Sequence, residues 1–173
     1  LIACYFTQKY LGQRYTLALL VVASLIFYAQ HVVEYLILMI SSVVFNYFCA
    51  ILISKNLGKG QQRSFAYCAL GVIVNLGLLG YFKYADFFIE TLSYLFDAQI
   101  STLRIMLPIA ISFYTFQQIS YLIDVYKNEA KEPSFLHYIF FVTFFPQLIA
   151  GPIVHHKQLM PQLNNFKPFQ SDN

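Results

Sequence analysis

Long uncharged stretches alternate with short polar segments along the chain. Five of them approach or reach the length that crosses a bilayer, which takes about 20 apolar residues for about 30 Å of hydrocarbon. They are Tyr15–Val33, Tyr35–Ser54, Ser64–Phe82, Ile105–Ile123 and Ser134–His156. None alternates apolar with polar residues as barrel strands do, and backbone groups in lipid must pair within their own segment. The pattern therefore predicts an all-α, polytopic bundle of transmembrane helices.

A sixth segment, Tyr84–Phe96, is shorter and carries Asp86 and Glu90. Its apolar positions recur at helical spacing, at Phe87, Phe88, Thr91, Leu92 and Leu95. Because charges interrupt it, we expect a separate helix that lies in the membrane interface or is buried against other helices.

Breaks between the stretches are short. Gly58 and Gly60 flank a lysine in a polar loop, and Lys127–Pro133 is the most charged part of the chain, after which Ser134 restarts a helix. With no long linker or repeat, residues 1–173 are interpreted as one transmembrane domain. The apolar start and the polar end predict a piece of a longer protein that is cut at both ends.

Composition supports lipid as the solvent of these stretches. The chain has 173 residues, of which 58% are hydrophobic and 11% charged, whereas soluble proteins carry about 25% charged residues. Its 18 Phe and 14 Tyr also suit membrane interfaces. The excess of apolar residues favours a membrane protein.

The basic residues predict orientation and exclude one class of partner. Lys9, Arg14, Lys55 and Arg63 flank the first two spans on one side, which the positive-inside rule places in the cytoplasm. Later basic residues are spread over several connections and leave the later orientation open. The net charge of +3 forms no stripe, so nucleic acid is not an expected partner.

Cysteine and histidine spacing predicts no metal site. Cys4, Cys49 and Cys68 form no CxxC pair, and the last two lie within apolar runs, where small packing residues are expected. No His/Cys/Asp cluster has ligand spacing.

Polar residues inside the spans need partners within the protein. Ser41, Ser42 and Asn46 lie in the second span, and Ser42 and Asn46 share a face because they are four residues apart. Hydrogen bonds between helices explain these residues and Asn75 of the third span. Lys83 comes after that span, and it either extends to the membrane boundary or contacts an anion or substrate.

The span near residue 117 carries a polar stripe. Gln117, Tyr121 and Asp124 lie along one helical side, with Tyr114 and Ser120 close by. Such a stripe faces a neighbouring helix or a water-filled path, so packing and substrate contact both stay open. Pro108 would kink this helix or lie in its first turn.

A proline-rich break interrupts the last stretch. Two prolines and a glycine fall within seven residues, from Pro146 to Pro152. Irregular backbone at membrane depth requires protein or water to satisfy it. The segment predicts a re-entrant or cavity-lining turn, or else a helix end at the interface.

These two segments carry a family resemblance. The run Leu107–Tyr126, followed by Phe145–Ile153, resembles the membrane-bound O-acyltransferase family, in its bacterial alginate O-acetyltransferase branch, with teichoic acid D-alanyl transferases as relatives. Asn46-Tyr47 and Leu79–Tyr84 resemble weaker landmarks of the family. The likeness extends from about Tyr15 to Leu163.

The resemblance implies an O-acetyltransferase acting on hydroxyls of an exported polysaccharide such as alginate. It implies a multi-pass protein of the bacterial cell membrane, surrounded by the lipid bilayer and assisted by periplasmic or extracellular acetylation proteins. No bound cofactor is implied, and the acyl donor is acetyl-CoA or an acylated carrier.

The resemblance places the catalytic base outside this chain. In the family an embedded histidine follows a Trp/Arg-rich run, and this chain has neither that run nor any Trp. His155 and His156 stand where the family commonly has Arg, so a role for that position is in doubt. Neighbouring residues on a helix point about 100° apart, so the two do not form a pair. No catalytic residue is assigned here.

This chain is interpreted as the N-terminal part of such an enzyme, which forms one wall of the substrate tunnel. The candidates are Gln117, Tyr121, Asp124, Pro146, Gln147, Gly151, Pro152 and, more weakly, Lys83. A transporter or flippase for lipid-linked sugars is the alternative, since broken helices and buried polar groups also mark transporters. A structural membrane scaffold is the third hypothesis.

Overall fold

The described part of the chain is helical. The computed structural model describes residues 6–7, 10, 12–30, 33–58, 60–97, 101–130, 134–144 and 146. Its helices are α2 (Gln13–Ala29), α3 (Val33–Asn56), α4 (Gln61–Leu95), α5 (Ile111–Tyr126) and α6 (Phe135–Thr143). Within those ranges no residue is in a strand, so the all-α prediction is confirmed there.

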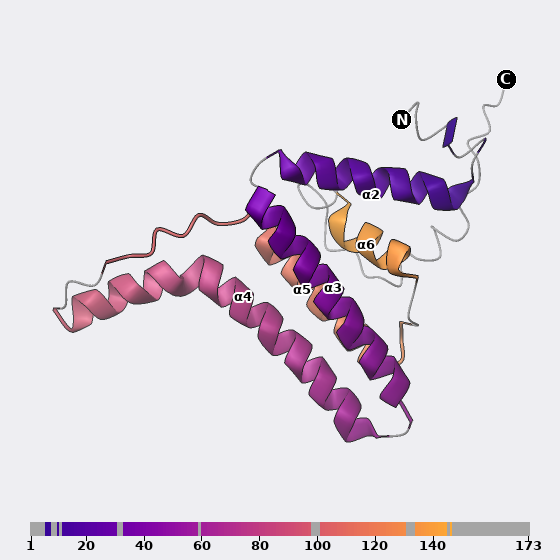
Figure 1. The fold of residues 1–173 in the computed structure, drawn as a ribbon. Helices are drawn as coiled ribbons and strands as arrows, with labels where there is room; N and C mark the ends of the chain where they lie inside the picture. The colour runs from indigo at the N-terminus through magenta and orange to yellow at the C-terminus, as the bar shows by residue number, and fades with distance from the viewer. Residues whose placement is uncertain are drawn as a thin grey trace.

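Three helices form the centre of the structure. Helices α3, α4 and α5 all contact one another, and Figure 1 shows α5 lying alongside α3. Helix α6 packs against α2, α3 and α5, while α2 crosses near the start of α3 (Figure 1). Side chains from α3, α4 and α5 therefore meet in one interior.

Two helices are long and apolar enough to cross a bilayer. They are α3, with 24 residues, and α4, with 35. Helix α2 is apolar but has 17 residues, slightly below the roughly 18 to 20 that a span needs. The prediction of helices long and apolar enough to span a bilayer is confirmed at α3 and α4, and the full polytopic bundle stays a prediction.

Helix α4 is longer than predicted. The stretches Ser64–Phe82 and Tyr84–Phe96 were expected to be separate helices, and the structure joins them into one. Lys83 does not interrupt the backbone, because lysine is a good helix former. Figure 1 shows that α4 bends partway along, so its last part points away from α3 and α5. Gly77 and Gly80 lie in this helix, and glycine eases such a bend.

Helix α5 begins later than predicted. Ile105 was expected to start it, but the helix starts at Ile111, after Ala110 in the left-handed conformation with φ of 58°. Pro108 is in neither of its two predicted places, because it precedes the helix in a turn that the Ile111 N–H closes onto the Pro108 carbonyl. Residues 101–108 are non-helical.

Side chains of three helices hold this non-helical segment. Both oxygens of Asp86 in α4 accept backbone hydrogen bonds, from the Leu103 N–H at 2.8 Å and the Ile105 N–H at 3.0 Å. Arg104 between them has φ of 49°, which turns alternate N–H groups toward one anion. Tyr28 and Tyr35 donate to backbone carbonyls farther along, at 2.8 and 2.6 Å. The segment is therefore fixed to the helices.

Asp86→Asn should loosen this segment. The amide NH₂ cannot accept, so one of the two N–H groups loses its partner, at a local cost of about 1–3 kcal/mol. Amide hydrogen exchange at residues 103 and 105 should accelerate roughly tenfold to hundredfold. Glu90→Gln, an exposed acid one turn further along α4, is the matched control and should leave exchange unchanged. Equal exchange in both variants contradicts the anchoring role.

Helix α6 begins where the sequence indicated. Ser134 is its N-cap and accepts from the His137 backbone N–H, as predicted for the restart after Pro133. The helix ends at Thr143, earlier than the predicted Ser134–His156 span. Residue 145 and residues 147–156 lie outside the described part, so the proposed re-entrant turn stays a prediction.

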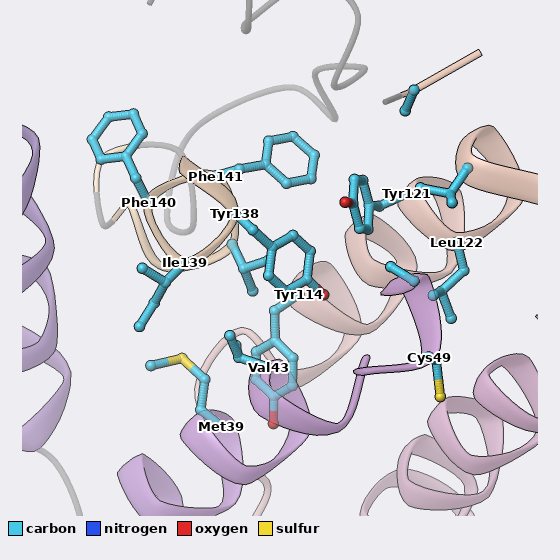
Figure 2. Close-up of a cluster of buried hydrophobic side chains, with 14 of the residues drawn as sticks. Met39, Val43, Cys49, Tyr114, Tyr121, Leu122, Tyr138, Ile139, Phe140 and Phe141 are labelled. Atoms are coloured by element: carbon cyan, nitrogen blue, oxygen red, sulfur yellow. The ribbon is translucent and has the colours of Figure 1, made fainter. Parts of the chain in front are cut away.

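Buried side chains from all five of the described helices form the core, and aromatic and aliphatic residues of α3, α5 and α6 supply most of it. Figure 2 shows Met39 and Val43 of α3 facing Tyr114 of α5 and Tyr138 of α6. The rings of Tyr121 and Tyr138 lie 4.6 Å apart between centroids, a favourable aromatic distance. Cys49 and Cys68 are buried free thiols, which confirms packing roles.

Gly71 allows α4 and α5 to approach closely. A Cβ at this position would lie 2.4 Å from Leu122 Cδ1, and Leu122 is fully buried. Gly71→Ala should therefore destabilise the fold by about 1–3 kcal/mol. Gly77→Ala is the control within the same helix, because a Cβ there meets nothing within 4 Å.

A double-mutant cycle tests this contact. Leu122→Ala alone removes core volume and should cost about 2–5 kcal/mol. Combined with Gly71→Ala it should cost less than the sum of the two, because the added methyl then has space. Thermal unfolding in detergent measures all four proteins, and strict additivity would rule out the clash.

Candidate functional site

A buried polar cluster joins α3, α4 and α5. Its centre is Asn46 of α3, which is 1% exposed. The Asn46 amide donates to Oε1 of Gln118 in α5 at 2.5 Å and to the Ser42 carbonyl of its own helix at 2.9 Å. Asn75 of α4 donates to Asn46 Oδ1 at 2.6 Å and to the Gly71 carbonyl at 2.7 Å. One asparagine thus links three helices.

The predicted role of these polar residues is confirmed for three of them. Ser42 donates to Gln118 Oε1 at 3.2 Å, and Asn46 and Asn75 bond each other across two helices. Ser41 differs, because it is exposed and its hydroxyl bonds only the Leu38 carbonyl of its own helix. An exposed serine satisfied in this way needs no partner helix.

Gln118 is the member of the cluster that the sequence did not single out. It comes directly after Gln117, so the two amides point about 100° apart around α5. The helical periodicity pointed to the side of α5 that carries Gln117, Tyr121 and Asp124 as the polar stripe. The available signal was that two consecutive amides in an apolar run must face two different neighbours, since neither suits lipid.

The predicted stripe faces the protein interior. Gln117 is 1%, Tyr121 0% and Asp124 9% exposed. The Gln117 amide donates to the Phe141 carbonyl of α6 at 2.8 Å, and Tyr121 stacks beside Tyr138. A stripe that points away from lipid is therefore present, as both open interpretations required.

Asp124 lies at the end of this stripe. Its backbone carbonyl accepts the Glu129 and Ala130 N–H groups, at 2.8 and 3.1 Å, and so closes the end of α5. Its position near the C-terminus of the helix places the carboxylate at the boundary of the buried core. Substrate contact by Asp124 stays a prediction.

Three buried polar atoms of α5 and α6 have no hydrogen-bond partner within the described residues. They are Gln117 Oε1, Gln118 Nε2 and the Tyr138 hydroxyl. A buried unpaired polar atom costs about 1–3 kcal/mol, so such atoms call for a partner. Gln117 Oε1 can accept from a hydroxyl, and Gln118 Nε2 can donate to a carbonyl or hydroxyl oxygen. These atoms could therefore pair with a hydroxyl or amide group that the described residues do not supply.

The remaining tunnel candidates do not lie on this stripe in the described structure. Lys83 is exposed on α4, with Nζ 5.4 Å from the centroid of the Tyr84 ring, and Pro146 is exposed. Gln147, Gly151 and Pro152 lie outside the described residues. Their contribution to a tunnel stays a prediction.

His137, the one histidine among the described residues, takes no part in the cluster. His137 Nδ1 pairs with the Ser134 hydroxyl at the start of α6. His31, His155 and His156 lie outside the described residues. Within the ranges that the structure covers, no group of three or more His, Cys, Asp or Glu side chains could hold a metal ion.

Comparison with known proteins gives relatives over most of the chain. It is 43% identical to the peptidoglycan O-acetyltransferase of Helicobacter pylori, over 84% of this chain. It is 42% identical to the probable alginate O-acetylase AlgI of Pseudomonas aeruginosa, over 89% of this chain, and 38% identical to that of Azotobacter vinelandii, over 88%.

The matched region is one part of those relatives. The chain spans 32%, 30% and 31% of their respective lengths, or about a third. No protein-family model matches the chain, and no solved structure matches it significantly.

Proposed function

Because this chain belongs to the membrane-bound O-acyltransferase family, in the branch of the bacterial O-acetylases, we propose that it forms the N-terminal helices of an enzyme that acetylates an exported polysaccharide. The observation that carries the proposal is the identity of 38–43% to proteins named for O-acetyl transfer, over 84–89% of this chain. The buried polar stripe on α5 supports it, since α5 lies within the motif that carries the resemblance.

The proposal places the chain in the bacterial cell membrane, as a multi-pass protein. Helices α3 and α4 cross the hydrocarbon, and the connection between them faces the cytoplasm, because Lys55 in the last turn of α3 and Arg63 in the first turn of α4 flank it. The opposite ends of both helices then lie on the outer side, where an exported acceptor is available. Helices α2, α5 and α6 complete the bundle together with the rest of the protein.

The proposed reaction transfers an acetyl group between two oxygen or sulfur atoms. A base removes the proton of the acceptor hydroxyl, and that oxygen attacks the acyl carbonyl of the donor. The donor bond breaks, and its thiol or alcohol leaves with a proton. The base is a histidine in a later part of the protein, and the donor is acetyl-CoA or an acylated carrier, as the resemblance implies.

Residues of α5 have a positioning part in this scheme. Gln117 Oε1 is buried, has no partner in the described structure and can accept from a sugar hydroxyl. Tyr121 and Asp124 extend the same side of α5 along the path of the acceptor. The Asn46 cluster behind them keeps the three helices in register.

Loss of the gene tests the proposal. In the producing bacterium, deletion should abolish O-acetyl groups on the acceptor polymer while polymer export continues, and a plasmid copy should restore them. Acetyl signals in the proton NMR spectrum of alginate and of peptidoglycan measure this and identify the acceptor. A mutant that lacks the polymer outside the cell, instead of its acetyl groups, would support the transporter or flippase. Unchanged acetylation and export would leave only the scaffold hypothesis.

A further inference from the structure

Beyond Leu79 no described residue of α4 is buried, although Phe82 is partly buried and packs against Tyr35 of α3. The buried residues of α4 are Ser64, Cys68, Gly71, Asn75 and Leu79. They recur at steps of three or four, so they form one stripe against α3 and α5. The stripe stops at Leu79, although the helix continues to Leu95. The final 16 residues of α4 therefore lie in a different environment from the buried stripe.

Helix α4 is longer than one crossing of the hydrocarbon requires. Its 35 residues extend about 52 Å at 1.5 Å per residue, whereas the hydrocarbon is about 30 Å thick. The uncharged run from Ser64 to Phe82 accounts for the crossing, and Lys83 is the first charge after it. The part of α4 beyond Lys83 must therefore leave the hydrocarbon, and Figure 1 shows α4 bending away from α3 and α5.

This distal part is both apolar and charged. Between residues 81 and 97 the exposed large side chains include Phe87 at 62%, Tyr94 at 89% and Phe96 at 74%. The same part carries Lys83, Asp86, Glu90 and Asp97. Exposed aromatic rings interspersed with charges suit neither the hydrocarbon nor bulk water, but they suit the layer between them.

The non-helical segment extends the same surface. Asp86 binds its backbone at residues 103 and 105, so it is fixed to this part of α4. It too exposes apolar side chains, with Leu103 at 55% and Met106 at 67%. Its backbone is not paired in a helix, which the hydrocarbon would not tolerate in contact with lipid.

We propose that α4 from Tyr81 to Leu95, together with residues 101–108, forms an arm that lies along the membrane surface, with its apolar side chains in the boundary between headgroups and acyl chains. The arm lies on the side of the membrane opposite to Lys55 and Arg63. The proposal rests on the proposed membrane function, because it assumes that the first part of α4 crosses the bilayer. The arm would lie in the leaflet from which an exported acceptor approaches.

Depth measurement with spin labels tests the arm. Phe87 and Tyr94 are seven residues apart, so they share a face of the helix and lie about 10 Å apart along its axis. In the full-length protein, single cysteines at these positions, at Met106 and at Ile73 receive a nitroxide after alanine has replaced the native cysteines. The protein is reconstituted in vesicles of phosphatidylethanolamine and phosphatidylglycerol, and collisions with oxygen and with an aqueous nickel chelate report depth.

Labels at residues 87, 94 and 106 should share a shallow depth within about 10 Å of the headgroups, while the label at 73, which is 67% exposed in the first part of α4, should lie near the bilayer centre. Depths at 87 and 94 that differ by about 10 Å would show a helix continuing along the normal and overturn the arm. Labels shielded from both reagents would show that other parts of the protein cover it, which also overturns it. A label at 73 outside the hydrocarbon would instead reject the membrane placement on which the proposed function depends.

Discussion

Asn46→Leu should lower the stability of this protein more than any other single change in its polar cluster. The substitution removes the hydrogen bonds of Asn46 to Asn75 and Gln118 and leaves both amides buried. Interhelical hydrogen bonds in membranes average about 0.6 kcal/mol and reach about 1.7. Since Asn46 takes part in three of them, we expect a loss of about 2–4 kcal/mol. Thermal unfolding in detergent or lipid measures it.

Asn56→Leu is the matched control in the same helix. Asn56 is partly exposed at the end of α3, and its amide donates to the Leu52 carbonyl, one turn back. The same chemical change there should shift stability by less than about 0.5 kcal/mol. If both leucine variants unfold at the same temperature, Asn46 does not hold the three helices together.

The sequence predicts α3 well because its boundaries are local. An uncharged run between Glu34 and Lys55 specifies both the length that lipid requires and the place where it ends, and the helix extends from Val33 to Asn56. The buried pairing of Ser42 and Asn46 is also predictable from local information, since polar groups four residues apart in an apolar helix must find a partner. Local information does not predict which residue that partner is.

Two boundaries could not be predicted because contacts distant in sequence determine them. The charge on Lys83 marks where the hydrocarbon ends, but a helix can continue beyond that point, as α4 does. Helix α5 starts six residues after Ile105, where it was expected to begin, because the preceding backbone is held by Asp86, Tyr28 and Tyr35 of other helices. The hydrophobicity pattern indicates whether a residue faces lipid or water, but it does not indicate which group bonds to the backbone of that residue.

The candidate site was predictable to the level of a helix side. Spacing placed Gln117, Tyr121 and Asp124 together, and all three are buried. It could not reveal that the neighbouring Gln118 faces α3 while Gln117 faces α6. Two consecutive glutamines therefore have different expected roles, and substitutions at the two positions should differ in effect.

In the full-length protein, the proposed contact with the acceptor predicts that Gln117→Met reduces acetyl transfer about tenfold to hundredfold while the protein stays folded. Methionine keeps the length of the side chain but removes both the donor to the Phe141 carbonyl and the unpaired Oε1. A tenfold change corresponds to about 1.4 kcal/mol, the expected size of one or two lost hydrogen bonds to a substrate. Rates of acetyl transfer to the polysaccharide, corrected for the folded fraction, measure the effect.

Gln118→Met is the counterpart that separates substrate contact from packing. Gln118 Oε1 already accepts from Ser42 and Asn46, so its loss should lower the unfolding temperature more than the rate per folded molecule. A contact between Gln117 and the acceptor predicts that kcat/KM falls for the polysaccharide and that the KM of the donor is unchanged, because such a contact involves the acceptor alone. If Gln117→Met loses activity only in proportion to unfolding, Gln117 is a packing residue, and the acceptor path lies elsewhere in the protein.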